Sequence, residues 1–367
     1  MKNNGILVIH PYLKSNRMSK DYCLEEAINL IKAIGLDCVE SSAVGLEKIS
    51  SKTFLNIGYI KKLKYKISEL KIELILININ LSPIQQRNLE NELNCKVLDR
   101  TALILEIFGS RAKSNEGKLS VMLASLQFQK SRLVRSWTHL ERQRGGAGFM
   151  GGPGEKQIES DRRQITEKIN RLKKKIRNIV LNRDSQRNRR MKSNIPIISL
   201  VGYTNSGKST LFNKLTKSNV LSKNMLFASL DSTIRKSFFK NINFLFVDTV
   251  GFIRDLPTTL IDAFKSTLDE IIYSDLILHV RDISSDYYLE QKNEVLNILQ
   301  EIGIYKDDKR IIEVINKIDL LDNTRRHHNY LSDQTVFVSA LNGEGIDNLK
   351  IKIADEYKRF QLSQESY

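Results

Sequence analysis

Apolar residues in the first 110 positions form short runs separated by helical patterns. The runs 5–10 (GILVIH), 52–57 (KTFLNI), 72–78 (IELILIN) and 95–99 (CKVLD) predict strands. Segments that start near Asp21, Tyr59, Pro83 and Thr101 predict helices, and Ser82 before Pro83 is typical of a capped helix start. Strands alternating with helices indicate an open, largely parallel α/β sheet.

From about Glu116 the apolar residues follow a helical period instead. A first stripe consists of Leu119, Met122, Leu126, Leu133, Trp137 and Leu140, and a second of Ile158, Ile165, Ile169, Leu172, Ile176 and Ile179. Both stripes fit heptads, so we expect two helices that pack along a seam as an antiparallel hairpin. Seam packing explains the aromatic and Met members better than a ligand site does.

The segment that joins the two helices, 144–154 (RGGAGFMGGPG), holds six glycines in eleven residues. A flexible linker would explain the glycines but not Phe149 and Met150 between basic helix ends. A tip that moulds to a partner, with Phe149 stacked on a base, is the alternative. Residues 184–194 (DSQRNRRMKSN) are polar and basic and predict a linker into the next domain.

Net charge changes this picture, because the chain carries +16 and the excess is local. Residues 130–192 hold 19 Lys and Arg against 6 Asp and Glu. A solvated helix face is the plain interpretation, but a run this long and one-signed favours a surface for a polyanion.

The remaining composition is that of an ordinary globular chain, with 41% hydrophobic and 27% charged residues. Cys23, Cys38 and Cys95 lack paired or metal-type spacing, which indicates reduced thiols. The apolar run near the N-terminus is too short for a signal peptide, and no stretch is long enough to span a bilayer. We therefore expect a cytoplasmic protein without stable membrane insertion; association of the basic helices with anionic lipid is a weaker alternative.

A nucleotide motif follows the buried-strand pattern at 195–200 (IPIISL). Residues 202–209 (GYTNSGKS) match GxxxxGK[ST] and lead into the helical pattern TLFNKL. Gly202 and Gly207 permit the tight turn whose N–H groups hold phosphates. We expect Lys208 to reach the β and γ phosphates and Ser209 to give a hydroxyl to Mg²⁺.

Further motifs follow in the order expected of a GTPase. A strand at 244–247 leads to Asp248-Thr-Val-Gly251, where Asp248 can hold Mg²⁺ through water and Gly251 can sense the γ phosphate. A strand at 311–315 leads to 316–319 (NKID), whose Asp319 can accept from guanine N1 and N2 together. Residues 336–340 (VFVSA) then place N–H groups near guanine O6. An ATPase would lack the last two elements, so the sequence predicts GTP.

The groups that catalyse hydrolysis are less evident. Many GTPases place a water-orienting Gln directly after the DxxG glycine, but this chain has Phe252. Either Phe252 points away and other groups position the water, or turnover is slow until a partner helps. Arg235 and Arg254 could stabilise charge, although a surface position is the simpler interpretation of each. Asn205 could help to hold K⁺, or could only stabilise the loop.

Together these residues resemble the HflX family of translational GTPases over most of the chain. The stretches LSPIQQRNLE, VLDRTALILEIF, RLVRSWTHLERQRGG, GGPGEKQIESDRR, GYTNSGKSTLFNKL, LFASLD and DTVGFIRDLP occur in family order. The resemblance implies a protein that binds GTP or GDP with Mg²⁺, is monomeric off the ribosome, binds the large ribosomal subunit, and splits stalled or stressed ribosomes. Its hairpin tip would approach the rRNA of the peptidyl transferase region through Arg144, Gly145, Gly146, Phe149, Met150 and Gly154. An assembly checkpoint that docks without splitting is the alternative.

The family pattern FATLD reads FASLD here, so the resemblance assigns the switch Mg²⁺ ligand to Ser229, with Thr233 as the fallback; the residues alone leave Ser229, Ser232 and Thr233 open. The glycine-lysine stretch of the N-terminal domain is incomplete at 58–61 (GYIK). The residues expected at the nucleotide are Gly202, Tyr203, Thr204, Asn205, Ser206, Gly207, Lys208, Ser209, Phe227, Ala228, Ser229, Leu230, Asp231, Asp248, Thr249, Val250, Gly251, Asn316, Lys317, Ile318, Asp319, Ser339, Ala340 and Leu341.

The expected architecture is an α/β protein with an N-terminal open α/β domain at 1–112, a basic helical hairpin with its linker at 113–192, a P-loop GTPase domain at 193–360, and a short tail at 361–367. We expect the GTPase sheet to be mixed, mostly parallel and flanked by helices.

Overall fold

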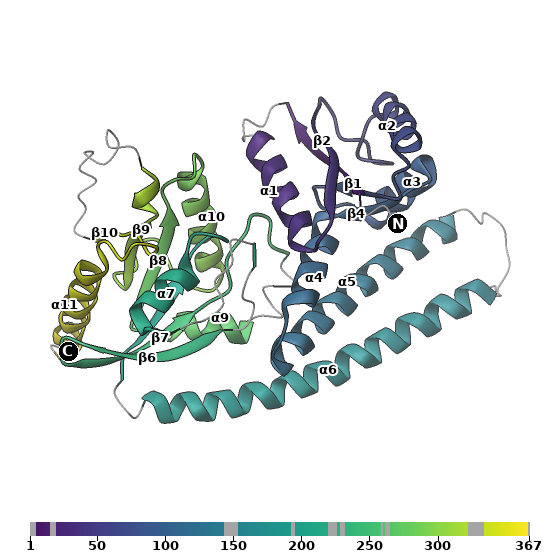
Figure 1. Cartoon of the computed structure of the whole chain (residues 1–367). Helices are drawn as coiled ribbons and strands as arrows, with labels where there is room; N and C mark the ends of the chain where they lie inside the picture. The colour runs from purple at the N-terminus through teal and green to yellow at the C-terminus, as the bar shows by residue number, and fades with distance from the viewer. Residues whose placement is uncertain are drawn as a thin grey trace. The chain divides into compact units, whose positions relative to one another are not determined.

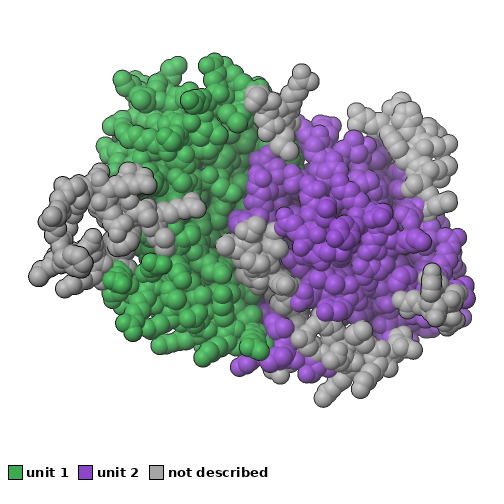
Figure 2. All heavy atoms as spheres, turned by 180° about the vertical axis from the view of Figure 1, so that it is seen from behind, with its two compact units in different colours: residues 1–110, 118–177 green, residues 111–117, 178–367 purple. Residues whose placement is uncertain are grey.

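The computed structural model describes residues 5–14, 20–142, 153–191, 195–218, 226–227, 232–257, 260, 265–321 and 334–365. The chain divides into two compact units, residues 1–110 with 118–177 and residues 111–117 with 178–367 (Figure 2). In the described part of the chain, no helix combines the length and the apolar character needed to cross a membrane.

The first unit contains a parallel four-stranded sheet in the order β2-β1-β3-β4 (Figure 1). Its strands are β1 (Gly5–Leu13), β2 (Asp37–Leu46), β3 (Leu74–Ile77) and β4 (Lys96–Asp99), and its helices are α1 (Lys20–Ala33), α2 (Ile57–Leu70), α3 (Pro83–Leu93) and α4 (Arg100–Arg111). A buried cluster joins one face of this sheet to α2 and α3 through Leu7, Ile75, Leu63 and Leu89. The predicted open parallel α/β domain is therefore confirmed.

One predicted strand in this unit is wrong. Residues 52–57 form a turn with an isolated bridge between Ser50 and Phe54, and α2 already begins at Ile57. The strand that pairs with β1 is instead Asp37–Leu46, which is hard to recognise because only Val44 and Leu46 of its residues are buried. The four helix starts agree with the prediction to within two residues, and Ser82 and Gln85 form a capping box at α3.

Helices α5 (Asn115–Arg142) and α6 (Pro153–Met191) form the predicted pair of long helices (Figure 1). Their seam contains Leu123, Leu126, Ile169 and Leu172, with Leu119, Ile165 and Ile176 packed against it. Met122 was predicted in this seam, but its side chain is 52% exposed. The spacing 119, 123, 126 places Leu123 on the buried stripe instead, one residue further along the helix.

The hairpin ends also differ from the sequence expectation. The predicted linker at 184–194 is helical as far as Met191, because its Arg and Gln residues are good helix formers. Pro153 and Gly154 belong to the first turn of α6 rather than to the joining loop, in keeping with Pro at a helix start. The tip residues Arg144, Gly145, Gly146, Phe149 and Met150 lie outside the described residues.

The second unit is built on a six-stranded sheet in the order β10-β9-β8-β5-β7-β6. Its strands are β5 (Ile197–Val201), β6 (Thr233–Phe239), β7 (Ile242–Asp248), β8 (Leu276–Asp282), β9 (Ile311–Asn316) and β10 (Thr335–Phe337). Only the β6–β7 pair is antiparallel, because a tight turn at Lys240 and Asn241 joins these strands. The mixed, mostly parallel sheet is as predicted.

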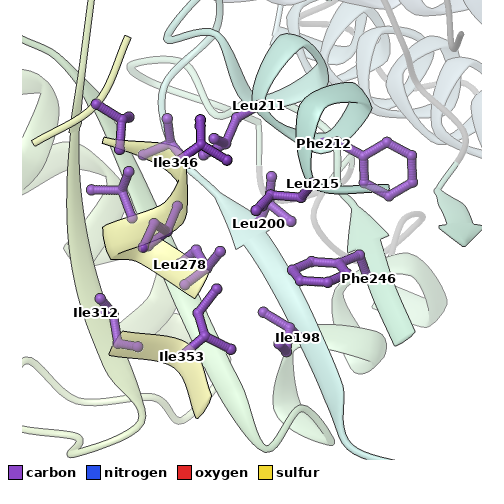
Figure 3. Close-up of a cluster of buried hydrophobic side chains, with 14 of the residues drawn as sticks. Ile198, Leu200, Leu211, Phe212, Leu215, Phe246, Leu278, Ile312, Ile346 and Ile353 are labelled. Atoms are coloured by element: carbon purple, nitrogen blue, oxygen red, sulfur yellow. The ribbon is translucent and has the colours of Figure 1, made fainter. Parts of the chain in front are cut away.

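Helices flank this sheet: α7 (Lys208–Thr216), α9 (Lys265–Ile272), α10 (Tyr288–Glu301), the short η1 (Ile318–Leu320) and α11 (Ile346–Glu365). One face packs against α7 and α11, where Leu200, Leu278, Leu211 and Ile353 meet in the core (Figure 3). On β5, Ser199 faces the other side and its hydroxyl donates to the Glu270 carbonyl oxygen of α9 at 3.3 Å. Helix α11 continues to Glu365, so the predicted tail is helical over most of its length.

Candidate nucleotide-binding site

Residues 202–207 form a tight turn between β5 and α7, at the carboxyl end of a central strand. We name it the phosphate turn after the ligand that its motif predicts. Gly207 is the residue before the helix and has φ +90°, a backbone conformation that favours glycine. A Cβ built on Gly207 would lie 2.2 Å from Nδ2 of Asn316. The turn therefore needs glycine here for its conformation and for the close approach of the 316–319 motif.

The side chain of Lys208 is buried beneath this turn. Its Nζ donates to the carbonyl oxygens of Gly202 at 3.1 Å and Tyr203 at 2.7 Å. Burial lowers the pKa of Lys208 to about 8, while the nearby Asp248 carboxylate acts in the opposite direction. A phosphate placed beside Nζ would favour the charged form of this amine.

Asp248 is the last residue of β7 and is also buried, with 2% of its surface exposed. The Ser209 hydroxyl donates to its Oδ2 at 2.6 Å, whereas the buried Oδ1 has no hydrogen-bond partner among the described residues. Burial raises the pKa of this carboxyl, and Ser209 and Lys208 oppose that shift. A buried carboxylate oxygen without a partner, next to a serine hydroxyl, is a donor set that fits Mg²⁺.

The segment after Asp248 lies against the turn. The Thr249 hydroxyl donates to the Leu200 carbonyl oxygen at 2.6 Å, which fixes the start of the segment on β5. The Phe252 side chain is only 2% exposed, so it packs in the core and points away from solvent.

The motifs predicted to recognise guanine meet at the ends of β9 and β10. Asn316 donates from Nδ2 to the Ser206 carbonyl oxygen at 2.9 Å and accepts from the Ala340 N–H at 3.0 Å, linking the phosphate turn to 339–341. The Ser339 hydroxyl donates to Oδ1 of Asp319 at 2.5 Å, which orients that carboxylate. Ile318 is half-buried beside them, and Leu341 is 69% exposed.

Other predicted residues have mixed outcomes. Asn205 is exposed, with φ +61°. Arg235 lies exposed on β6, whereas Arg254 is only 8% exposed, so the expectation of a surface arginine is wrong for Arg254. Phe227 is buried with φ +54°, and Thr233 is the half-buried first residue of β6. Ala228, Ser229, Leu230 and Asp231 lie outside the described residues.

The structure also shows two side chains that the motifs missed. Asp282, at the end of β8, accepts from Lys317 Nζ at 2.6 Å and thereby holds the 316–319 motif. Its position at a carboxyl strand end was the available signal. Tyr203 was expected only as part of the turn, but its hydroxyl accepts from the Arg254 N–H at 3.1 Å.

Comparisons with known proteins identify the family of the chain. Residues 21–109 match the family described as GTP-binding GTPase N-terminal, residues 111–190 match GTP-binding GTPase Middle Region, and residues 197–317 match 50S ribosome-binding GTPase. The chain is 44% identical to GTPase HflX of Magnetococcus marinus over 95% of this chain and 82% of that protein. The chain belongs to the HflX family of GTPases.

A second relative and a solved structure extend the comparison. GTPase HflX of Escherichia coli is 38% identical over 94% of this chain and 80% of its own length. The solved structure of SsGBP in complex with GDP is 26% identical, covers 96% of this chain and 98% of its own, and has a TM-score of 0.51. As an HflX-family P-loop GTPase, the protein binds guanine nucleotides and hydrolyses GTP.

Proposed function

We propose that this GTPase docks on the large ribosomal subunit through its basic hairpin and, in the GTP state, dissociates stalled or stressed ribosomes into subunits. The description of its nucleotide domain family, 50S ribosome-binding GTPase, supports a ribosomal partner. The observation that carries the docking surface is the charge on α6.

Within α6, residues 162–177 hold eight Lys and Arg and one acidic residue, Glu167. The apolar seam residues Ile169 and Leu172 are buried against α5, and the basic residues lie off that seam and are exposed. The exposed basic residues are Arg162, Arg163, Lys168, Arg171, Lys173, Lys174, Lys175 and Arg177. Glu167 lies near Arg163 and Arg171, so most of these charges are free to meet rRNA phosphates.

The nucleotide would be held by groups already described. The turn 202–207 and Lys208 would bind the phosphates, and Asn316, Asp319 and Ala340 would recognise guanine. Ser209, Asp248 through water, and Ser229 would hold Mg²⁺, and the ion would supply positive charge to neutralise the phosphates. Asn205 is proposed as a K⁺ ligand in the exposed part of the turn.

Phe252 supports the proposal that turnover depends on the ribosome. Its side chain is buried and carries no hydrogen-bonding group, so it cannot orient a water molecule. We therefore expect slow hydrolysis alone and strong stimulation by large subunits. If Asn205 holds K⁺, replacing K⁺ by Na⁺ should lower the stimulated rate, and Asn205→Ala should remove that difference.

The test is sedimentation of ribosomes and isolated subunits with the protein and GTP, GDP or a non-hydrolysable GTP analogue. The proposal expects binding to large subunits and conversion of whole ribosomes to subunits with the analogue. Shortening the segment 145–152 should abolish conversion and leave docking largely intact. Docking of the parent protein without conversion would favour the assembly-checkpoint role, and no docking would refute both.

A variant that removes positive charge from α6 tests where the ribosome-docking surface lies. Replacing Lys173, Lys174 and Lys175 by alanine should weaken docking and reduce the log–log salt slope by about 2 to 3, because each lost phosphate contact contributes roughly 0.7 to 0.9. The matched control replaces Lys61, Lys62 and Lys64, which are exposed on α2. Equal losses in the two variants would contradict docking through the hairpin.

A further inference from the structure

The phosphate turn and the segment 251–254 continue the parallel pairing of β5 with β7 beyond the ends of both strands. Tyr203 and Phe252 form an isolated parallel bridge. The Phe252 N–H donates to the Gly202 carbonyl oxygen at 3.1 Å, and the Thr204 N–H donates to the Phe252 carbonyl oxygen at 2.8 Å. The phosphate turn therefore uses backbone groups of Gly202 and Thr204 to hold the neighbouring segment.

The Tyr203 side chain adds a further link to this ladder. Its ring is buried, and its Oη accepts from the Arg254 N–H at 3.1 Å. Phe252 is 2% exposed, and Ile253, between the two linked positions Phe252 and Arg254, is 0% exposed. The segment is thus fixed by the backbone bridge at Phe252 and by a phenol hydroxyl at Arg254.

This arrangement leaves little space beside Lys208. A Cβ built on Gly251 would lie 2.9 Å from Thr204 Cα and 3.1 Å from Lys208 Nζ. Lys208 Nζ is in turn held by the carbonyl oxygens of Gly202 and Tyr203. A γ phosphate must reach both Lys208 and the Gly251 N–H, so its entry requires this segment to move away. A nucleoside diphosphate has no group at that position.

We propose that Tyr203 determines the balance between GTP and GDP: its hydroxyl stabilises the ladder that closes the γ-phosphate position. The ladder favours the diphosphate state, and γ-phosphate entry breaks it, releasing residues 252–254. Tyr203 is a positioning residue that acts through the segment rather than by touching the nucleotide with its side chain. This inference rests on the GTPase site alone and does not depend on ribosome binding.

Tyr203→Phe tests the inference because it removes one hydroxyl and keeps the buried ring. Affinities for GDP and for a non-hydrolysable GTP analogue are measured by calorimetry on the full chain with Mg²⁺. Loss of one hydrogen bond should shift the ratio of the two dissociation constants toward the GTP analogue by about 2- to 10-fold. General damage to the turn would change both affinities equally, since both nucleotides share the guanosine and the β phosphate.

Tyr357→Phe is the matched control, because its hydroxyl on α11 accepts a hydrogen bond from Gln361 Nε2 at 2.7 Å, outside the nucleotide site. It should leave the ratio unchanged. An unchanged ratio in Tyr203→Phe, whether or not the separate affinities move together, would overturn the proposal.

Hydrogen exchange of the parent protein gives a second test that needs no variant. Peptides that cover 249–257 should be protected with GDP and should exchange at least several-fold faster with the GTP analogue, because the Phe252 and Arg254 amides are released. Equal protection with the two nucleotides would contradict the ladder as a γ-phosphate sensor.

Discussion

Replacing His279 by leucine should remove part of the acid sensitivity of the GTPase unit. His279 lies on the central strand β8, opposite Val201 on β5 and Glu313 on β9. It is 1% exposed, and neither ring nitrogen has a hydrogen-bond partner among the described residues. Burial lowers its pKa to about 3; Glu313 opposes the shift, and Arg281, Lys292 and Lys208 add to it.

The sign and size of the effect follow from this shift. An unfolded histidine takes up a proton below about pH 6.5, but buried His279 stays neutral down to about pH 3. Its contribution to stability is therefore complete above pH 6.5 and is lost as the pH falls toward 3. At pH 5 the loss amounts to about 2 kcal/mol, since each pH unit between the two pKa values costs roughly 1.4 kcal/mol.

The assay is native-state hydrogen exchange of peptides covering β8 at pH 7.5 and pH 5, corrected for the intrinsic pH dependence of exchange. Exchange at β8 reports the stability of the second unit directly. The fluorescence of the single tryptophan, Trp137, would instead report the first unit, because this residue lies on α5. Protonation of carboxylates at low pH lowers the stability of both proteins, so the quantity compared is the difference in stability loss between parent and variant. The parent should lose about 2 kcal/mol more than His279→Leu. Equal losses of stability in parent and variant would refute the claim that buried His279 stays neutral at pH 5.

Three other predictions concern the nucleotide site and the seam. GDP binding at pH 8 should take up about half a proton, because phosphate returns the depressed pKa of Lys208 toward its ordinary value. For the same reason, GDP affinity should fall above pH 8. Calorimetry in buffers of different ionisation enthalpy measures both the proton uptake and the affinity. Gly207→Ala should reduce GDP affinity by roughly 10-fold or more without unfolding the unit, as titrations and thermal melts would show. Leu123→Ala should lower the free energy of unfolding by about 2 to 4 kcal/mol, because Leu123 is buried in the seam. The neighbouring Met122→Ala should lower it by less than about 1 kcal/mol, because Met122 is exposed. Urea unfolding followed by Trp137 fluorescence measures both, and similar losses would contradict the assignment of Leu123 rather than Met122 to the seam.

The elements predicted correctly from sequence are those whose local pattern agrees with their environment. Strand β5 is apolar throughout and buried throughout, and the start of α3 has its cap, proline and capping glutamine in adjacent positions. Strand β2 was missed because its sequence, DCVESSAVGL, is mostly polar and partly exposed, as suits the edge of a sheet. Its strand character comes from pairing with β1, which no local pattern records.

The same distinction applies within the site. Short motifs specify the backbone turn and its immediate chemistry, so Gly207, Lys208, Asp248 and Asn316 could be predicted from spacing. The contact from Tyr203 to Arg254 joins residues 51 positions apart, and its geometry depends on how β5 and β7 end side by side. Arg254 was misjudged because the residues next to it in the sequence do not indicate how deeply a charged side chain is buried.

The unsatisfied groups at this site connect its stability to its function. Asp248 leaves a buried oxygen without a described partner, and the buried Lys208 amine has a depressed pKa. Both conditions oppose folding when no nucleotide is bound, because desolvated charges are costly. Phosphate beside Lys208 and Mg²⁺ beside Asp248 would relieve both costs at once. Nucleotide should therefore stabilise the second unit, and stabilisation by GDP with Mg²⁺ should exceed that by GDP with a chelator.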